Sequence, residues 1–93
     1  MSWNIVLDRN VYYDIAEMLD AVESNSASQL SSEYRGLLST ELLKRILYDR
    51  GYKLKDADAY SNAAVIVFRK DDLTVTVQLF YDRGLSRITV YHG

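Results

Sequence analysis

Few residues of this sequence could carry covalent chemistry. There is one histidine, His92, next to the last residue, and there is no cysteine. A nucleophile needs a positioned base, and a zinc site needs several ligands, so an exposed terminal histidine supports neither. Asp71 and Asp72 are the only adjacent carboxylates, and their place between two strand patterns is typical of a solvated turn. We therefore expect a protein that is not an enzyme and uses no metal or cofactor.

The tyrosines are better suited to binding than to catalysis. A tyrosine offers a large rigid contact with a polar tip, and protein interfaces are enriched in it. Most of the set can be half-buried at the edge of a core, but helical periodicity places Tyr13 and Tyr48 on polar faces. The eight tyrosines are Tyr12, Tyr13, Tyr34, Tyr48, Tyr52, Tyr60, Tyr81 and Tyr91.

Tyr13 stands inside an acidic arc formed by Asp14, Glu17 and Asp20. An aromatic anchor with a charged rim is typical of a protein interface. The acids would attract a basic partner, such as a protein that itself holds nucleic acid. The alternative is a solvated helix face whose tyrosine folds over a neighbouring loop. The sequence thus predicts a protein-binding surface that includes these four residues and Tyr48.

A group of basic residues predicts an alternative binding site around the end of the second expected helix. It consists of Lys44, Arg45, Arg50, Lys53 and Lys55. Basic residues near a helix C-terminus are also expected from the helix dipole alone. The functional alternative is a patch that contacts nucleic-acid phosphates or an acidic partner.

The same region resembles the opening of the HicA-type mRNA-interferase toxins. The matching segments are Glu-Leu-Leu-Lys at 41–44, Arg-Gly-Tyr-Lys-Leu at 50–54, Val-Phe-Arg at 67–69 and Val-Thr-Val at 75–77. The resemblance covers roughly residues 41–78 and implies a fold like that of double-stranded-RNA-binding domains. The family's catalytic histidine precedes the second strand, where this sequence has Ser61-Asn62-Ala63, and a strand replaces its C-terminal helix. The resemblance therefore implies a nucleic-acid-binding module and no active toxin.

These candidates must be positioned by a sheet and by helices, and the sheet has the clearest pattern. From Leu73 to Tyr81 apolar residues alternate with mostly polar ones, which puts one face of a strand on a core. The segment Ala63–Phe68 is apolar on both faces, as in a strand that is covered on both sides. Leu85–Tyr91 completes a three-stranded antiparallel meander, with turns at 71–72 and 82–84.

Two amphipathic helices are expected to cover the apolar face of this meander, because such a sheet is not stable alone. The first is Asn10–Glu23 with Asn10 as its N-cap, and the second is Leu37–Arg50 with Ser39 or Thr40 as its cap. Gly51 ends the second helix. In the expected core, Val75, Val77 and Leu79 pack against Ile15, Leu19, Leu43 and Ile46.

The remaining segments carry weaker signals. Alternation at Trp3–Leu7 predicts a short strand that adds to the sheet, or else a packed arm. The serine-rich segment Ser24–Ser32 is a linker or loop, Tyr52–Lys55 is a possible short strand, and Asp56–Asn62 is a polar loop. The expected fold is a single α+β domain over residues 1–93, with two helices on one face of an antiparallel sheet of three to four strands.

Composition narrows the class of function. The chain has 93 residues, a net charge of −2 and no cysteine, and no apolar run approaches the length of a membrane span. We expect a cytoplasmic protein that binds another protein and no membrane, with a homodimer as an open possibility. By compositional analogy it is an inhibitor or immunity-type protein of a phage or mobile element, of the anti-CRISPR kind. The alternative is the nucleic-acid-binding module.

Overall fold

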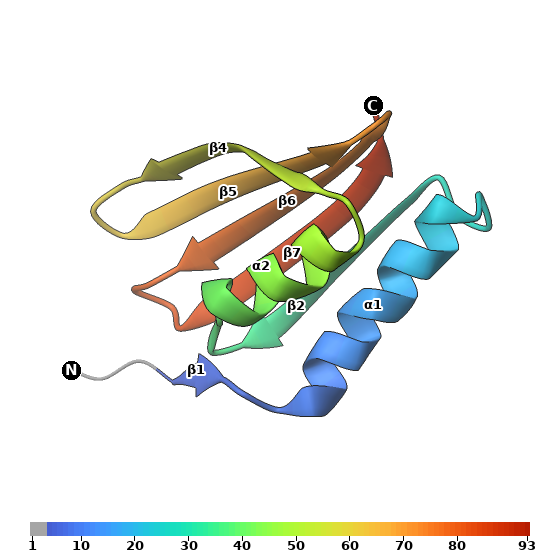
Figure 1. Cartoon of the computed structure of the whole chain (residues 1–93). Helices are drawn as coiled ribbons and strands as arrows, with labels where there is room; N and C mark the ends of the chain where they lie inside the picture. The colour runs from blue at the N-terminus through green and yellow to red at the C-terminus, as the bar shows by residue number, and fades with distance from the viewer. Residues whose placement is uncertain (1–3) are drawn as a thin grey trace.

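An antiparallel sheet of five strands is covered on one face by two helices in the computed structural model, which describes residues 4–93 (Figure 1). The strand order is β2–β7–β6–β5–β4. Its strands are β2 (Gln29–Arg35), β4 (Lys53–Ala59), β5 (Ala63–Lys70), β6 (Leu73–Phe80) and β7 (Leu85–His92). The helices are α1 (Arg9–Glu23) and α2 (Thr40–Asp49), and neither is long and apolar enough to cross a membrane. The α+β class is confirmed, but the sheet is wider than the three to four strands predicted.

The C-terminal meander is confirmed and forms the centre of the sheet. Its strands β5, β6 and β7 pair antiparallel, with Val77 of β6 opposite Ile66 on one side and Ile88 on the other. One face of β6 lies in the core, as its alternation predicts, and Val77 is fully buried. The predicted core is confirmed by the burial of Val75, Val77, Leu79, Ile15, Leu19 and Leu43 in one cluster, against which Ile46 packs partly exposed.

Both helices begin where a side chain caps them, α2 at Ser39, one of its two predicted caps, and α1 at a residue other than the predicted one. The Asp8 carboxylate accepts a hydrogen bond from the Asn10 amide at 3.0 Å, so Asp8 and not Asn10 is the N-cap of α1. The Ser39 hydroxyl accepts from the Leu42 amide at 3.3 Å, so α2 begins at Thr40. Gly51 follows α2 with φ +92°, the left-handed conformation expected of a glycine that ends a helix.

Two strands extend through segments that were predicted to be loops, although β4 begins within the short strand predicted at Tyr52–Lys55. Strand β2 lies partly in the serine-rich segment and pairs with β7 over its whole length, and β4 continues to Ala59. Both are edge strands, so backbone pairing with one neighbour holds them with little apolar content. In β2, half-buried residues (Leu30, Ser32 and Tyr34) alternate with exposed ones. In β4, every residue is exposed.

The N-terminal strand does not join the main sheet, contrary to the prediction. Strand β1 (Ile5–Val6) pairs in parallel with β3 (Leu37–Leu38), which was predicted to be the start of the second helix. Gly36 allows this contact, because its φ is +94° and a Cβ there would lie 2.8 Å from the Asn4 carbonyl oxygen. Trp3 lies outside the described residues.

Within residues 4–93, no helix covers the second face of the sheet. Val65 and Val67 on this face of β5 are half-buried, so the prediction that this strand is covered on both sides is wrong. Their lateral neighbours on β6 and β7, such as Gln78, Thr76 and Thr89, supply part of the cover. The uninterrupted apolar residues of β5 therefore reflect its position between two other strands, and they do not indicate a layer of structure on the open face of the sheet.

Candidate functional site

The exposed Tyr13 lies beside an apolar groove between the start of α1 and the side of α2. Its side chain is 60% exposed, as its position in the acidic arc predicts. The groove has a volume of about 240 Å³ and is lined by Leu7, Arg9, Tyr12, Tyr13, Leu42, Arg45 and Ile46. The segment between β1 and α1 and the two helices thus bring five large uncharged side chains together.

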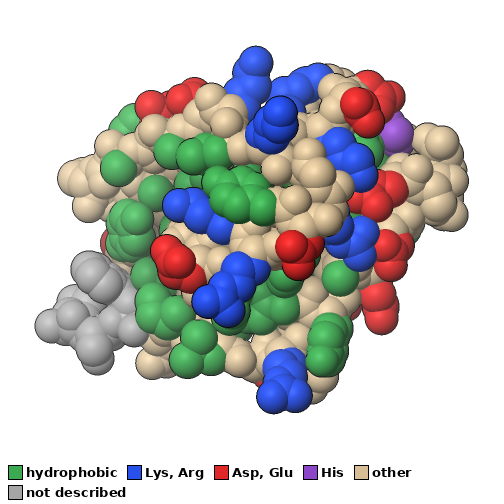
Figure 2. All heavy atoms as spheres, in the orientation of Figure 1, with side chains coloured by type: hydrophobic (Ala, Val, Ile, Leu, Met, Phe, Trp, Pro, Cys, Tyr) green, Lys and Arg blue, Asp and Glu red, His purple; other side chains and the backbone are tan. Residues whose placement is uncertain are grey.

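The groove has an apolar floor and two guanidinium groups among its lining residues. Leu7 is 69% exposed, the highest value among the large hydrophobic side chains of the described residues. Arg9 and Arg45 are exposed residues of α1 and α2. Figure 2 shows hydrophobic side chains at the surface below α2, toward the start of α1, with basic side chains among them. A surface of this kind can accept an apolar side chain of a partner.

Tyr12 holds the elements of the groove together. Its hydroxyl donates to the Val6 carbonyl oxygen and accepts a hydrogen bond from the Ser39 amide at 2.8 Å. It therefore joins β1, α1 and the N-cap of α2 through one atom. Burial raises the pKa of this hydroxyl, and the bond from Ser39 works in the opposite direction. The Tyr12 hydroxyl therefore uses both of its hydrogen-bonding roles to hold together the elements that line the groove.

The acidic residues around Tyr13 differ in how far they are neutralised. Asp14 accepts a hydrogen bond from the Tyr34 hydroxyl at 3.0 Å, and burial together with that bond raises the pKa of Tyr34 to about 12. Asp20 forms an ion pair with Arg50 at 2.8 Å. Glu17 is exposed, and no ion pair to it is found within residues 4–93. The predicted acidic rim therefore has one carboxylate that is free to meet a partner without breaking a contact.

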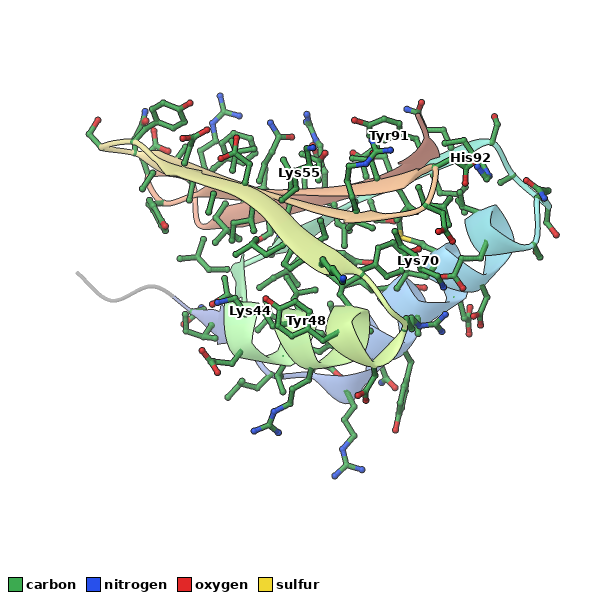
Figure 3. The ribbon with its side chains drawn as sticks, turned by 45° about the horizontal axis from the view of Figure 1, so that its top comes forward. Lys44, Tyr48, Lys55, Lys70, Tyr91 and His92 are labelled. Atoms are coloured by element: carbon green, nitrogen blue, oxygen red, sulfur yellow. The ribbon has the colours of Figure 1, made fainter. Side chains whose placement is uncertain are left out.

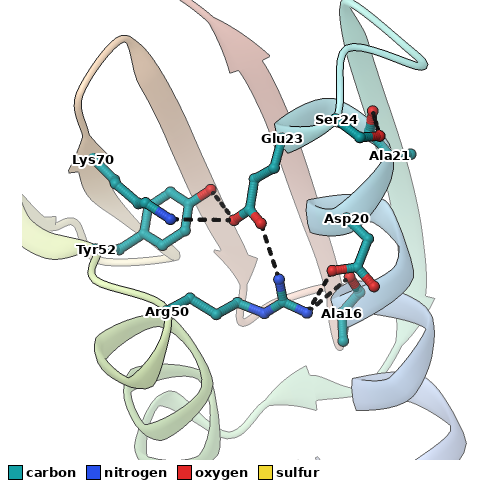
Figure 4. Close-up of polar contacts among 8 residues, drawn as sticks. All are labelled: Ala16, Asp20, Ala21, Glu23, Ser24, Arg50, Tyr52 and Lys70. Carbon is teal, nitrogen blue, oxygen red and sulfur yellow. Dashed lines mark hydrogen bonds and ion pairs between the residues drawn. The ribbon is translucent and has the colours of Figure 1, made fainter.

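Glu23, one turn beyond Asp20, is the centre of a polar cluster at the end of α1 (Figure 4). Its two carboxylate oxygens accept from Arg50 at 3.1 Å and from the Tyr52 hydroxyl at 2.8 Å. Lys70 lies 4.0 Å from the same carboxylate and 5.4 Å from the centre of the Tyr52 ring. Burial and the bond to Glu23 raise the pKa of Tyr52. The cluster connects α1 to the end of α2 and to β5, so it serves the fold.

The five basic residues of the alternative site do not form one patch. Arg50 is occupied by Asp20 and Glu23. Figure 3 shows Lys44 beside Tyr48 on α2, on the helical side of the sheet, whereas Lys55 lies on β4. Arg45 lines the groove, and Lys53 is exposed at the start of β4.

Tyr48 and His92 both make contacts that the sequence did not indicate. Tyr48 is about half exposed and packs edge-on against Phe68, with ring centres 6.2 Å apart, so it does not line the groove. The His92 ring nitrogens lie 3.2 Å from an Asp72 carboxylate oxygen and 2.9 Å from the Val22 carbonyl oxygen. The histidine therefore ties the last strand to α1, where a fraying terminal residue was expected.

The sequence missed Leu7, Arg9 and Leu42 as members of the candidate site. Leu7 belonged to a predicted strand, and Leu42 to a predicted buried stripe. Only the parallel pairing of β1 with β3 brings Leu7 beside α2, and no local pattern indicates that pairing. A leucine immediately before Asp8, a residue type that often caps helices, was the one signal available.

The chain matches no protein-family model, and neither the curated proteins nor the solved structures contain a match. The resemblance to the HicA-type toxins therefore has no support from these comparisons. The function of the groove must be argued from its own residues.

Proposed function

We propose that this protein is a non-enzymatic protein-binding module that acts through the groove beside Tyr13. The observation that supports the proposal is the pairing of two highly exposed apolar side chains, Leu7 and Tyr13, with a preformed apolar groove. Single exposed apolar residues are ordinary on protein surfaces, but a contiguous set around a hollow is typical of a binding site.

The energetic basis of the proposed interface is apolar. Burial of exposed apolar surface stabilises a complex by about 25 cal/mol per Å², and tyrosine is among the residues that dominate interface energies. The Tyr13 backbone belongs to α1, whose inner stripe is buried, so little order has to be gained on binding. A rigid anchor of this kind lowers the entropic cost of association.

Charge on the same helix suggests the kind of partner. Glu17 is one turn from Tyr13, and Asp14 and Asp20 are exposed on α1 as well. The Glu17 carboxylate, which has no ion pair among the described residues, favours a basic group on the partner and would increase its association rate, and a protein that holds nucleic acid is one such partner. We assign the module to the inhibitor or immunity type, as expected for a phage or mobile-element product of the anti-CRISPR kind. A nucleic-acid-binding function is not proposed, because Arg50 is paired and the other bases are dispersed.

The proposal is tested by photocrosslinking from the groove in cells of the organism that encodes the chain. A photoreactive phenylalanine analogue replaces Tyr13 in one variant and Tyr60 in a control, because both tyrosines are 60% exposed. We expect one protein to crosslink from position 13 and not from position 60, and competition by the wild-type chain to abolish the product. The same products from both positions, or none from position 13, would contradict the proposal.

A further inference from the structure

Strand β4 is an open edge of the sheet. It pairs with β5 and with no other strand among the described residues, and all seven of its residues are exposed. An unpaired strand edge is a template for another strand, and proteins often protect such edges with charges. The charges of β4 are unusual in their order, because two lysines precede two aspartates.

This order makes β4 complementary to a second copy of itself. In an antiparallel pair around a two-fold axis between residues 55 and 56, Lys53 faces Asp58, Lys55 faces Asp56, and Leu54 faces Ala57. Each cross-strand pair then joins opposite charges or two apolar side chains, which stabilises antiparallel strands. Shifting this register by one residue places Asp56 against Asp56 or Lys55 against Lys55, which is unfavourable.

The side chains also point to the faces that this pairing requires. Lys53 and Asp58 lie opposite Arg69 and Val65 of β5, which belong to the open face of the sheet. Leu54 and Ala57 lie opposite Phe68 and Ile66, which pack with the helical core. The register shift between Leu54 and Asp56 is essential here. Without it, residues 53 and 58 would point to opposite faces, because the side chains of a strand alternate.

A backbone amide at this edge can change its hydrogen-bond acceptor when a second strand pairs with β4. The Tyr60 amide donates to the Ala63 carbonyl oxygen of β5, so the alternation of an antiparallel ladder turns the Ala57 amide toward the free edge, where it donates to the carboxylate of Asp56 at 3.0 Å. In the paired strands it would donate to the Leu54 carbonyl oxygen of the other copy. The Asp56 carboxylate is then released to meet Lys55 of that copy.

We infer that two copies of this chain associate through β4 in the register described, joining their five-stranded sheets into one continuous sheet. The exposed apolar residues beside β4 support this assignment. Leu54 lies opposite Phe68 of β5, against which Tyr48 packs. Tyr48 and Leu54 are 48% and 43% exposed, and the second copy would bring its own Leu54 beside them. The occupant of the edge is therefore the chain itself and not an unrelated strand.

Charge swaps test the inference in the full-length chain. We expect sedimentation equilibrium to give a dimer of twice the 10.7 kDa chain mass. Lys53→Asp/Lys55→Asp makes the edge acidic, and Asp56→Lys/Asp58→Lys makes it basic, so each variant alone should self-associate at least about tenfold more weakly. A mixture of the two should recover a mixed dimer. The control Glu41→Lys/Asp82→Lys changes the net charge as much as the basic variant does, outside β4.

Cysteines test the register, because the chain has none of its own. Directly opposite residues of an antiparallel pair have Cα atoms about 4.5–5.5 Å apart, which a disulfide can bridge. Leu54→Cys mixed with Ala57→Cys should oxidise rapidly to a crosslinked dimer, whereas Leu54→Cys mixed with Ala59→Cys should not. A wild-type monomer up to millimolar concentration would overturn the inference. So would a dimer that is insensitive to the β4 charges, or equal crosslinking from both mixtures.

Discussion

At the scale of single residues, the core tolerates substitution by a charged residue least. Val77 is fully buried between Ile66 and Ile88. Folded domains are stable by about 5–15 kcal/mol, and burial of an unpaired carboxylate costs a comparable amount. We predict that Val77→Asp unfolds the protein, which circular dichroism would detect. Val67→Asp on the half-buried open face is the control and should remain folded. A Val77→Asp variant with an unchanged spectrum would refute the packing.

Tyr34 gives the molecule a response to alkaline pH. Its pKa is raised from 10.0 to about 12 by burial and by the bond to Asp14. A group whose pKa is raised in the folded state stabilises that state below its unfolded pKa, and the stabilisation is lost as pH rises through the folded pKa. We predict a melting temperature that falls between pH 10 and 12, with a smaller fall in Tyr34→Phe. Tyr60→Phe is the control, and an equal effect of the two variants would contradict the assignment.

The sequence predicted the environment of a residue only where that environment is set by residues nearby in the chain. The exposure of Tyr13 followed from helical periodicity alone, and the structure agrees. The pairing of Asp20 with Arg50 did not, because it joins residues 30 positions apart through the packing of two helices. The sequence therefore predicted where the acidic arc beside Tyr13 lies. It did not predict which of its carboxylates are already paired within the protein.

At the scale of elements, the strands at the centre were predictable and those at the edges were not. Strand β6 is bordered by neighbours on both sides, so its alternation follows the two faces of the sheet. Strands β2 and β4 have one neighbour each. Backbone pairing holds them whatever their side chains are, so serine-rich and charged sequences there resemble loops.

The docking of β3 against the sheet depends on Ser86. This fully buried serine accepts a hydrogen bond from the Leu38 amide at 2.9 Å and donates one to the Gly36 carbonyl oxygen at 2.8 Å. We predict that Ser86→Ala destabilises the fold by about 1–3 kcal/mol, because it leaves buried backbone groups without partners. Chemical denaturation measures this loss. Ser31→Ala, which removes an exposed bond to Thr89, is the control and should cost less than about 0.5 kcal/mol.

At the scale of the whole molecule, the groove and the β4 edge use different surfaces. The groove is formed by the start of α1 and by α2, whereas β4 ends the sheet at the other side of α2 (Figure 1). A dimer through β4 would therefore present two grooves, and binding to a partner with two sites would gain from avidity. Loss of one function leaves the other intact, so the two proposals can fail separately.

The dispersion of the basic residues leads to a prediction about nucleic acid. A surface that binds phosphates shows affinity that falls steeply with salt. With Arg50 paired and Lys44 and Lys55 on different elements, we predict no shift of DNA or RNA in gels at low salt. A shift that charge reversal of Lys44 and Arg45 abolishes would instead support the alternative function.

The most direct measurement of protein binding through the groove is the affinity of the crosslinked partner for matched tyrosine variants. We predict that Tyr13→Ala weakens binding by about 1–3 kcal/mol in titration calorimetry, because it removes the aromatic anchor, while the melting temperature stays nearly unchanged. Tyr60→Ala removes a tyrosine of the same 60% exposure and should bind as the wild type does. Unchanged affinity of Tyr13→Ala, or an equal loss in both variants, would contradict binding at the groove.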